Sequence, residues 1–408
     1  MNGMVAPLRL RSTGEESRRK VTWLELFFDL IFVAAVSQVA EPLRDHYTLV
    51  GLVRFVPLFA LIWWAWIGHT VFATRFDTDD AMQRVLTLVQ MFVVAVMAAN
   101  AKDALDSRSS AGFAAAYAAL RFLLVAQYLR ASTVAEARPL TLRYLVGHGA
   151  AAVLWMTSAL VPAPERFWIW GVAFAIDLGT PWLAVKHSVA APPDSAHLPE
   201  RFGLFTLILL GEAVIDVMQG MESQEDWTPA AAASAFLGMA ISFLIWWWYF
   251  DGAAGGSEQP VRTTRDAFRF HVWTYAHFPL SLGIVVVGVG IQRIVTAASH
   301  TALASADARI LIAAVALVML SLTTVGALST ERRTSRAASL PVHLLIVAAT
   351  VVVGVAAQIE SPVIMILLLA GSCISQLVVS LPRPAAPAAI GAPAAVRHES
   401  TRTRSHKH

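Results

Sequence analysis

The sequence is poor in cysteine and in charge. Only one cysteine, Cys373, occurs in 408 residues, and it lies inside an apolar stretch. A single cysteine excludes an intramolecular disulfide and a zinc site built from several cysteines. Charged residues make up 14% of the chain, against about 25% in an ordinary soluble domain. This shortage of charge argues against a soluble globular protein.

Several catalytic motifs are also missing. The chain contains no His-Glu-x-x-His, no Gly-x-Ser-x-Gly and no glycine-rich phosphate loop, so the enzyme classes that these motifs mark find no support. We interpret the terminal His406-Lys407-His408 as a flexible basic tail. We therefore predict a protein that is not an enzyme and has no metal site and no cofactor. The first twenty residues lack an apolar stretch, so we expect no cleavable signal peptide.

Apolar residues are abundant and occur in long blocks. They make up 57% of the chain, and the mean hydropathy is +0.60. About 20 helical residues cross the roughly 30 Å hydrocarbon core of a bilayer, and about twelve blocks approach this length. We predict an all-α, polytopic transmembrane helical bundle. The expected spans are 22–40, 50–73, 83–101, 111–129, 144–161, 167–186, 201–219, 229–250, 271–292, 308–328, 341–358 and 361–380.

Lysine and arginine are distributed unevenly between the two sides that these spans define. Of the 31 basic residues, 23 fall in the two tails and in the loops on the same side, and six fall on the opposite side. Cytoplasmic loops carry the excess of basic residues in membrane proteins. We therefore predict a multi-pass plasma-membrane protein with both termini in the cytoplasm. Its expected partner is the lipid bilayer and not nucleic acid, and the oligomeric state stays open.

The spans divide into two halves of six, and similar residues recur in both. Tryptophans cluster late in the second span at 63–66 and late in the eighth at 246–249, and His148 and His343 open the fifth and eleventh spans. Six spans return the chain to the same side, which gives a parallel repeat about an axis along the membrane normal. The predicted organisation is a basic tail at 1–20, repeats at 21–190 and 198–381, and a disordered tail at 382–408.

The first and seventh spans each carry two acids four residues apart, Glu25/Asp29 and Glu212/Asp216. This spacing places both carboxylates of a pair on one face of a helix. The pairs differ in depth, because Glu25 lies near the start of its span and Glu212 lies roughly 15 Å inside at 1.5 Å per residue. A second register aligns Glu25 with Glu200 at equal depth but loses the pairing of acids. Both registers are open at this stage.

Two runs of residues resemble a known family. Residues 21–33 read Val-Thr-Trp-Leu-Glu-Leu-Phe-Phe-Asp-Leu-Ile-Phe-Val, and residues 200–212 read Glu-Arg-Phe-Gly-Leu-Phe-Thr-Leu-Ile-Leu-Leu-Gly-Glu. Both resemble runs of the bacterial low temperature requirement A (LtrA) family of integral membrane proteins, and the resemblance extends over about residues 20–380. It implies membrane location and architecture, whereas the family name records a growth phenotype and implies no activity. The matching residues are Trp23, Glu25, Phe27, Phe28, Asp29, Glu200, Arg201, Phe202, Gly203, Gly211 and Glu212.

Charged residues are predicted deep inside several spans. An ionised side chain at the bilayer centre costs on the order of 2.5–3.5 kcal/mol, and such residues face the bundle interior or a water-filled cavity. We interpret them as candidates for a polar pathway or for proton coupling. In a structural alternative, these charges only hold the bundle together, and Arg54 or Arg121 pairs with an acid. In a third alternative, an acid keeps its proton because desolvation disfavours the charged form. The candidates are Asp29, Glu212, Asp216, Asp177 and Arg121, together with the shallower Glu25.

These features favour a proton- or ion-coupled secondary transporter of a small solute. The alternatives are a cation channel and a non-transporting membrane protein that supports growth at low temperature. We expect the first and seventh helices to lie centrally, because they carry the most deep polar groups. We also expect Asp29 and Glu212 to face a shared polar cavity. At least one of these two acids then exchanges a proton during function. The sequence does not name the solute or the ion.

Overall fold

The computed structural model describes residues 8–10, 21–77, 80–106, 109–224, 228–253, 257–298, 303–329, 333–357 and 359–381. The predicted C-terminal tail at 382–408 and most of the predicted N-terminal tail at 1–20 lie outside these ranges.

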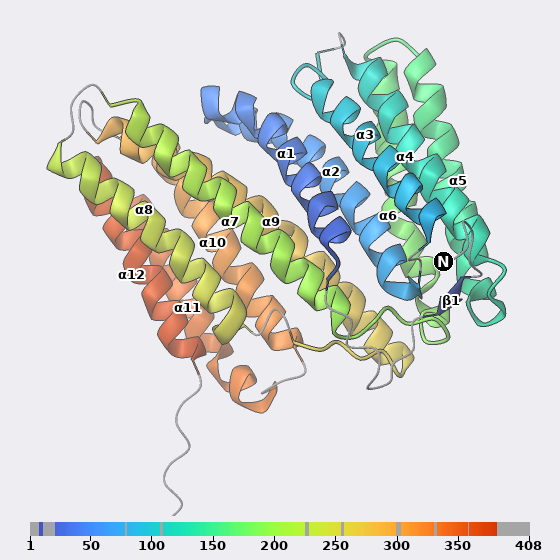
Figure 1. Ribbon diagram of the computed structural model, residues 1–408. Helices are drawn as coiled ribbons and strands as arrows, with labels where there is room; N and C mark the ends of the chain where they lie inside the picture. The colour runs from blue at the N-terminus through green and yellow to red at the C-terminus, as the bar shows by residue number, and fades with distance from the viewer. Residues whose placement is uncertain are drawn as a thin grey trace, which may run out of the picture.

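The described part of the chain contains twelve α-helices, and the fold is all-α and polytopic, as predicted (Figure 1). The first half holds α1 (Trp23–Asp45), α2 (Leu49–Arg75), α3 (Ala81–Ala99), α4 (Ser110–Ala131), α5 (Arg138–Leu160) and α6 (Glu165–Leu183), with turns η2 (Ala135–Ala137) and η3 (Val185–His187). The second half holds α7 (His197–Glu222), α8 (Pro229–Trp247) with its π-helical extension η4 (Trp248–Gly252), α9 (Thr264–Ala297), α10 (Ser305–Leu328), α11 (Arg333–Ala356) and α12 (Pro362–Ser380). Two short strands, β1 (Arg9–Leu10) and β2 (Phe76–Asp77), pair antiparallel.

Ten of these helices are long and apolar enough to cross a membrane. The other two, α5 and α6, are long enough but less apolar, because polar residues such as His148 interrupt α5 and Arg166 and Asp177 interrupt α6. Every predicted span therefore corresponds to a helix, although two of the helices are less apolar than the rest.

The predicted span ends are wrong at several places, and two of them have a clear physical cause. α9 begins at Thr264 and not at residue 271, because Thr263 and Asp266 form a capping box that starts the helix in the polar loop. α1 continues to Asp45 although the predicted span ends at residue 40, and it contains Pro42. Membrane helices tolerate proline because neighbouring groups satisfy the freed backbone carbonyl. This extension places Arg44 on α1.

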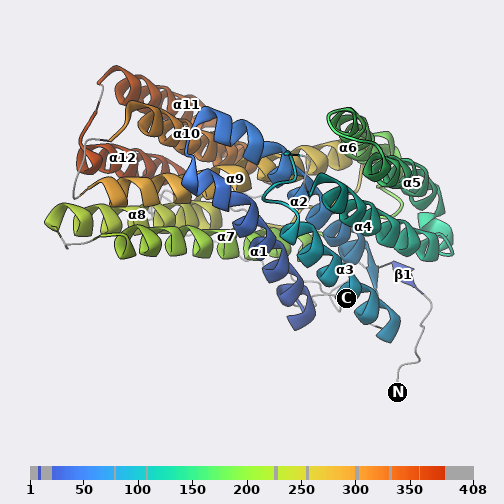
Figure 2. The same ribbon diagram turned by 90° about the horizontal axis from the view of Figure 1, so that it is seen from above.

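The two halves lie side by side, with α1 and α7 between them (Figures 1 and 2). In the first half α1 packs against α2 and α3, and each later helix from α3 to α5 packs against the next. In the second half α7 packs against α8 and α9, and each helix from α9 to α11 packs against the next. This shared order of neighbours supports the predicted repeat. The superposition of the two halves stays a prediction.

The helices α1 and α7 run parallel and contact each other through charged residues. Asp29 near the start of α1 pairs with Arg201 near the start of α7, and Arg44 near the end of α1 pairs with Asp216 farther along α7. Both pairs are 172 residues apart in the sequence, so the two helices keep one register. Asp29 and Asp216 face the interface between α1 and α7, as predicted for the acidic sides. The central position of the two helices in the bundle stays a prediction.

This register bears on the alignment of the predicted repeats. His197 and Arg201 both contact Glu25, at 3.1 Å and 3.4 Å, so Glu25 lies level with the start of α7. Glu200 belongs to that same turn, whereas Glu212 lies three turns farther along. Parallel repeats about a membrane-normal axis place equivalent residues at equal depth. The structure therefore favours the register that aligns Glu25 with Glu200.

Candidate functional site

The first group of charged residues lies near the starts of α1 and α7, and we call it the inner cluster: Glu25, Asp29, Trp66, His197 and Arg201. Asp29 and Arg201 are completely buried. Arg201 donates from Nε to Asp29 Oδ2 at 3.0 Å and from Nη2 to Oδ1, and Trp66 Nε1 donates to Oδ1 at 2.7 Å. A two-pronged arginine–carboxylate contact of this kind fixes geometry as well as charge. Both oxygens of Asp29 therefore accept hydrogen bonds from donors.

Glu25 has two roles in the inner cluster. Its Oε2 accepts a hydrogen bond from the backbone N–H of Thr22 at 2.8 Å, and Thr22 caps the helix in return, so the two residues form a capping box. Its Oε1 lies 3.1 Å from His197 Nε2 and 3.4 Å from Arg201 Nη1. Glu25 is thus at the helix start, as predicted, and it also joins the first half to the second.

The second group lies farther along the same two helices, and we call it the outer cluster: Ser37, Arg44, Glu212 and Asp216. Arg44 donates from Nη2 to Glu212 Oε1 and from Nε to Asp216 Oδ1, each at 2.7 Å. The Ser37 hydroxyl donates to Glu212 Oε1. Asp216 is completely buried, and its Oδ2 accepts no hydrogen bond from the residues that the structure describes. Two carboxylates therefore share one guanidinium, and one buried carboxylate oxygen has no donor in the described part of the chain.

The third group lies inside the first half, among α4, α5 and α6. Arg121 Nε lies 2.8 Å from Asp177 Oδ2, and His148 Nδ1 lies 2.8 Å from Asp177 Oδ1. The Arg121 guanidinium also lies over the ring of Tyr117, 4.7 Å from its centroid. These contacts show the ion pair that the structural alternative expects for Arg121. The exposed Arg54 likewise pairs with Asp106.

The six predicted residues are thus distributed over three clusters. Asp29 and Glu25 belong to the inner cluster, and Glu212 and Asp216 belong to the outer one. Asp29 is held by donors and has no exposed surface. Asp29 and Glu212 were predicted to share one polar cavity. The contacts instead place the two acids in separate ion-pair clusters.

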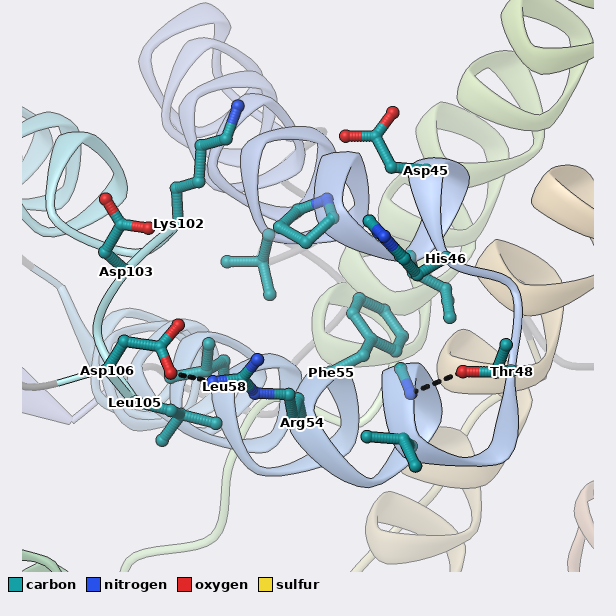
Figure 3. A pocket seen from close by; sticks show the side chains of 15 residues that line it. Asp45, His46, Thr48, Arg54, Phe55, Leu58, Lys102, Asp103, Leu105 and Asp106 are labelled. Carbon is teal, nitrogen blue, oxygen red and sulfur yellow. Dashed lines mark hydrogen bonds and ion pairs between the residues drawn. The ribbon is translucent and has the colours of Figure 1, made fainter.

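A cavity of about 500 Å³ lies near the ends of α1 and α3 and the start of α2. Val39 and Leu43 of α1 line it, whereas Ser37 and Arg44 contact α7, so the cavity and the outer cluster lie on different faces of α1. Neither Asp29 nor Glu212 lines this cavity. Figure 3 shows its polar lining, which includes Asp45, His46, Thr48, Arg54, Lys102, Asp103 and Asp106.

Close packing of α7 and α9 holds Asp216 in place. A Cβ atom at Gly288 of α9 would lie 2.6 Å from Asp216 Oδ2 and 2.9 Å from the Cα atom of Ala213. We expect Gly288→Ala to lower the free energy of unfolding by about 1–3 kcal/mol, because added atoms strain a packed interior. Denaturation of the detergent-purified protein measures this loss. The matched control is Gly171→Ala, where the added Cβ meets no atom within 4 Å, and equal stabilities of the two variants would contradict the packing argument.

The first family-like run exposes one face and buries the other. Trp23 and Phe27 are 88% and 53% exposed on the bundle surface, where a membrane protein contacts lipid or the interface. Phe28 is buried, with its ring centroid 4.0 Å from that of His69. The run therefore combines lipid contact with the buried acid of the inner cluster.

The second family-like run begins with Glu200, whose side chain is 44% exposed, followed by the buried Arg201 and Phe202. A Cβ atom at Gly203 would lie 3.1 Å from the ring of Phe250, whereas Gly211 has no neighbour within 4 Å of such an atom. Two of the three charged members of this run, Arg201 and Glu212, thus belong to the two clusters between the halves.

Sequence reasoning missed several partners of the predicted acids. Arg44 was assigned to a loop, because the predicted first span ended before it, and Trp66 was treated only as part of a tryptophan cluster. The available signal for Arg44 was its spacing of seven residues from Ser37, which places both on one helix face. His197 carried no such signal, because its contact with Glu25 depends on tertiary structure.

Twelve helices with buried ion pairs between two halves define a polytopic α-helical membrane protein. The sequence model of the bacterial low temperature requirement A protein (LtrA) family matches residues 20–373, and the chain belongs to this family. An uncharacterized protein of Rhizobium meliloti (strain 1021) is 29% identical over 287 residues, which cover 66% of this chain and 68% of that protein.

Proposed function

We propose that this protein is a proton-coupled secondary transporter of a small solute, with the α1–α7 interface as its coupling element. The observation that carries the proposal is the outer cluster, where Glu212 and Asp216 share Arg44 and Asp216 Oδ2 has no hydrogen-bond donor among the described residues. Two carboxylates beside one guanidinium leave one negative charge uncompensated. A single proton bound between the carboxylates removes that charge. The cluster is therefore suited to bind and release one proton.

The inner cluster is suited to a different task. Both oxygens of Asp29 accept hydrogen bonds, from Arg201 and Trp66, and a protonated Asp29 would lose acceptor capacity that these donors use. Asp29 and Arg201 therefore act as a fixed connection between the halves near the starts of α1 and α7. We place the proton at Glu212 and Asp216, and assign a structural role to Asp29.

The experiment that tests transport uses purified protein in liposomes with an imposed pH gradient. We expect addition of pooled amino acids, sugars or short carboxylic acids to give solute-dependent proton movement, read by a pH-sensitive dye trapped inside. Empty liposomes are the control. Steady single-channel current in planar bilayers, without coupled solute uptake, would instead establish a channel and overturn the proposal.

We also propose that both chain termini lie in the cytoplasm. The start of α1 and the end of α12 lie at the same end of the bundle (Figure 1), and most of the basic residues belong to this side. A reporter fused after Leu381 is expected to show cytoplasmic activity. A fusion after Asp106, in the loop that follows α3, should report the opposite side. A periplasmic signal after Leu381 would contradict this orientation.

A further inference from the structure

A second cavity lies between the two halves, beside the end of α2. Its volume is about 30 Å³, which is room for one small ion or a few atoms. Helices α2, α4, α5 and α6 of the first half and α9 of the second half form its walls. Its polar and aromatic lining includes Trp64, Arg75, Tyr128, Tyr144, His271 and Thr274.

Arg75 is a buried cation in the wall of this cavity. Its side chain is 1% exposed, and no carboxylate of the described residues forms an ion pair with it. Nη2 lies 3.5 Å from the hydroxyl oxygen of Ser188, and the guanidinium carbon lies 5.4 Å from the ring centroid of Tyr144. The side chains of Tyr128 and Tyr144 also interact with the guanidinium, although Nε and Nη1 have no described partner in good hydrogen-bond geometry. The contacts of this guanidinium are therefore with neutral groups.

Arg75 differs in this respect from the other two fully buried arginines. Arg121 pairs with Asp177, and Arg201 pairs with Asp29. Arg75 ends α2, and the C-terminal end of a helix carries about half a negative elementary charge. That partial charge offsets only part of the charge of a guanidinium, and burial of an ion without an ionic partner costs free energy.

Two further residues that line the same cavity have a buried donor without a partner among the described residues. Trp64 Nε1 and Thr274 Oγ1 are buried, and neither has a hydrogen-bond partner among the described residues. Trp64 belongs to α2, as Arg75 does, whereas Thr274 belongs to α9 of the second half. The cavity thus combines one uncompensated positive charge with N–H and O–H donors from both halves. This is the donor set of an anion site.

We propose that this cavity binds a small monovalent anion, the size of a halide or of a short carboxylate group, between Arg75 of the first half and Thr274 of the second. The volume excludes a bulky organic acid, and the single guanidinium matches a single negative charge. Bound there, the anion connects α2 to α9 across the interface between the halves. The site is separate from the α1–α7 clusters, and its occupation does not depend on the proposed transport.

The experiment measures the thermal stability of the purified full-length chain in detergent at constant ionic strength. Chloride and formate are titrated separately against a background of gluconate, which is too large for the cavity. We expect a saturable rise in melting temperature with chloride, with formate or with both. A response to formate alone identifies the carboxylate group as the ligand, and a response to chloride identifies a halide. A melting temperature that does not change with the concentration of either ion overturns the proposal.

Variants then locate the binding. Arg75→Gln is expected to raise the apparent dissociation constant at least about tenfold, because charge-assisted hydrogen bonds are lost. The matched control is Arg143→Gln, an exposed arginine of α5, which should leave the response unchanged. If Arg75→Gln does not fold, Thr274→Val tests the same site from α9 and should also weaken the response. An unchanged dissociation constant in either folded site variant overturns the proposal.

Discussion

Replacing Asp216 by asparagine is expected to reduce pH-gradient-driven uptake to the level of empty liposomes, while the protein still folds and inserts. The amide keeps the size of the side chain and an oxygen that accepts from Arg44 Nε. It cannot take up a proton at the buried oxygen that now has no donor. Glu212→Gln should have a similar effect, because it leaves Asp216 alone beside Arg44 and removes the second carboxylate of the pair.

The measurement compares membrane abundance with uptake for each variant. The matched control is Glu222→Gln, an exposed acid at the end of the same helix, which should retain full uptake. Solute exchange in the absence of a pH gradient should survive in Asp216→Asn, because binding of the solute is separate from proton coupling. Full gradient-driven uptake by both amide variants of the outer cluster would contradict the proton role.

Replacing Arg201 by leucine is expected to lower the free energy of unfolding by about 3–5 kcal/mol, because it leaves the buried Asp29 without its charge partner. Asp29→Asn should also destabilise the protein, since its amide N–H groups would face the donors of Arg201 and Trp66. The double variant should be less destabilised than the sum of the single variants, because the two residues contact each other directly.

Denaturation of the detergent-purified protein gives these free energies, provided that unfolding is reversible. The matched control is the exposed ion pair of Arg54 and Asp106, with side chains about half exposed. Arg54→Leu should cost less than about 1 kcal/mol, as exposed ion pairs do. A loss for Arg201→Leu no greater than that for Arg54→Leu would contradict the structural role of the inner cluster.

Hydropathy was sufficient to predict the helices, because a span must satisfy every backbone hydrogen bond internally and present apolar side chains to lipid. It could not predict where they end. The capping box of Thr263 and Asp266 starts α9 in a polar segment, and α1 passes through Pro42 to include Arg44. Helix ends depend on a few hydrogen bonds, which an average over 20 residues does not detect.

The acids of the candidate site could be found from the sequence, because a carboxylate inside an apolar helix is costly and therefore conspicuous. Their grouping could not. Arg201 and Asp29 are 172 residues apart in the chain, and their contact depends on the parallel packing of α1 and α7. Arg75 was counted only among the loop charges on one side, because its burial among aromatic side chains follows from tertiary structure.

The measurement that most directly tests the central claim is infrared spectroscopy of carboxyl groups in the lipid-reconstituted protein as the pH is lowered. A protonated carboxyl group gives a C=O band that an ionised one lacks. We expect the wild-type protein to develop such a band in a step that is absent from Asp216→Asn or Glu212→Gln and present in Glu222→Gln. Identical pH-dependent spectra in the wild type and in both outer-cluster variants would contradict proton binding between α1 and α7.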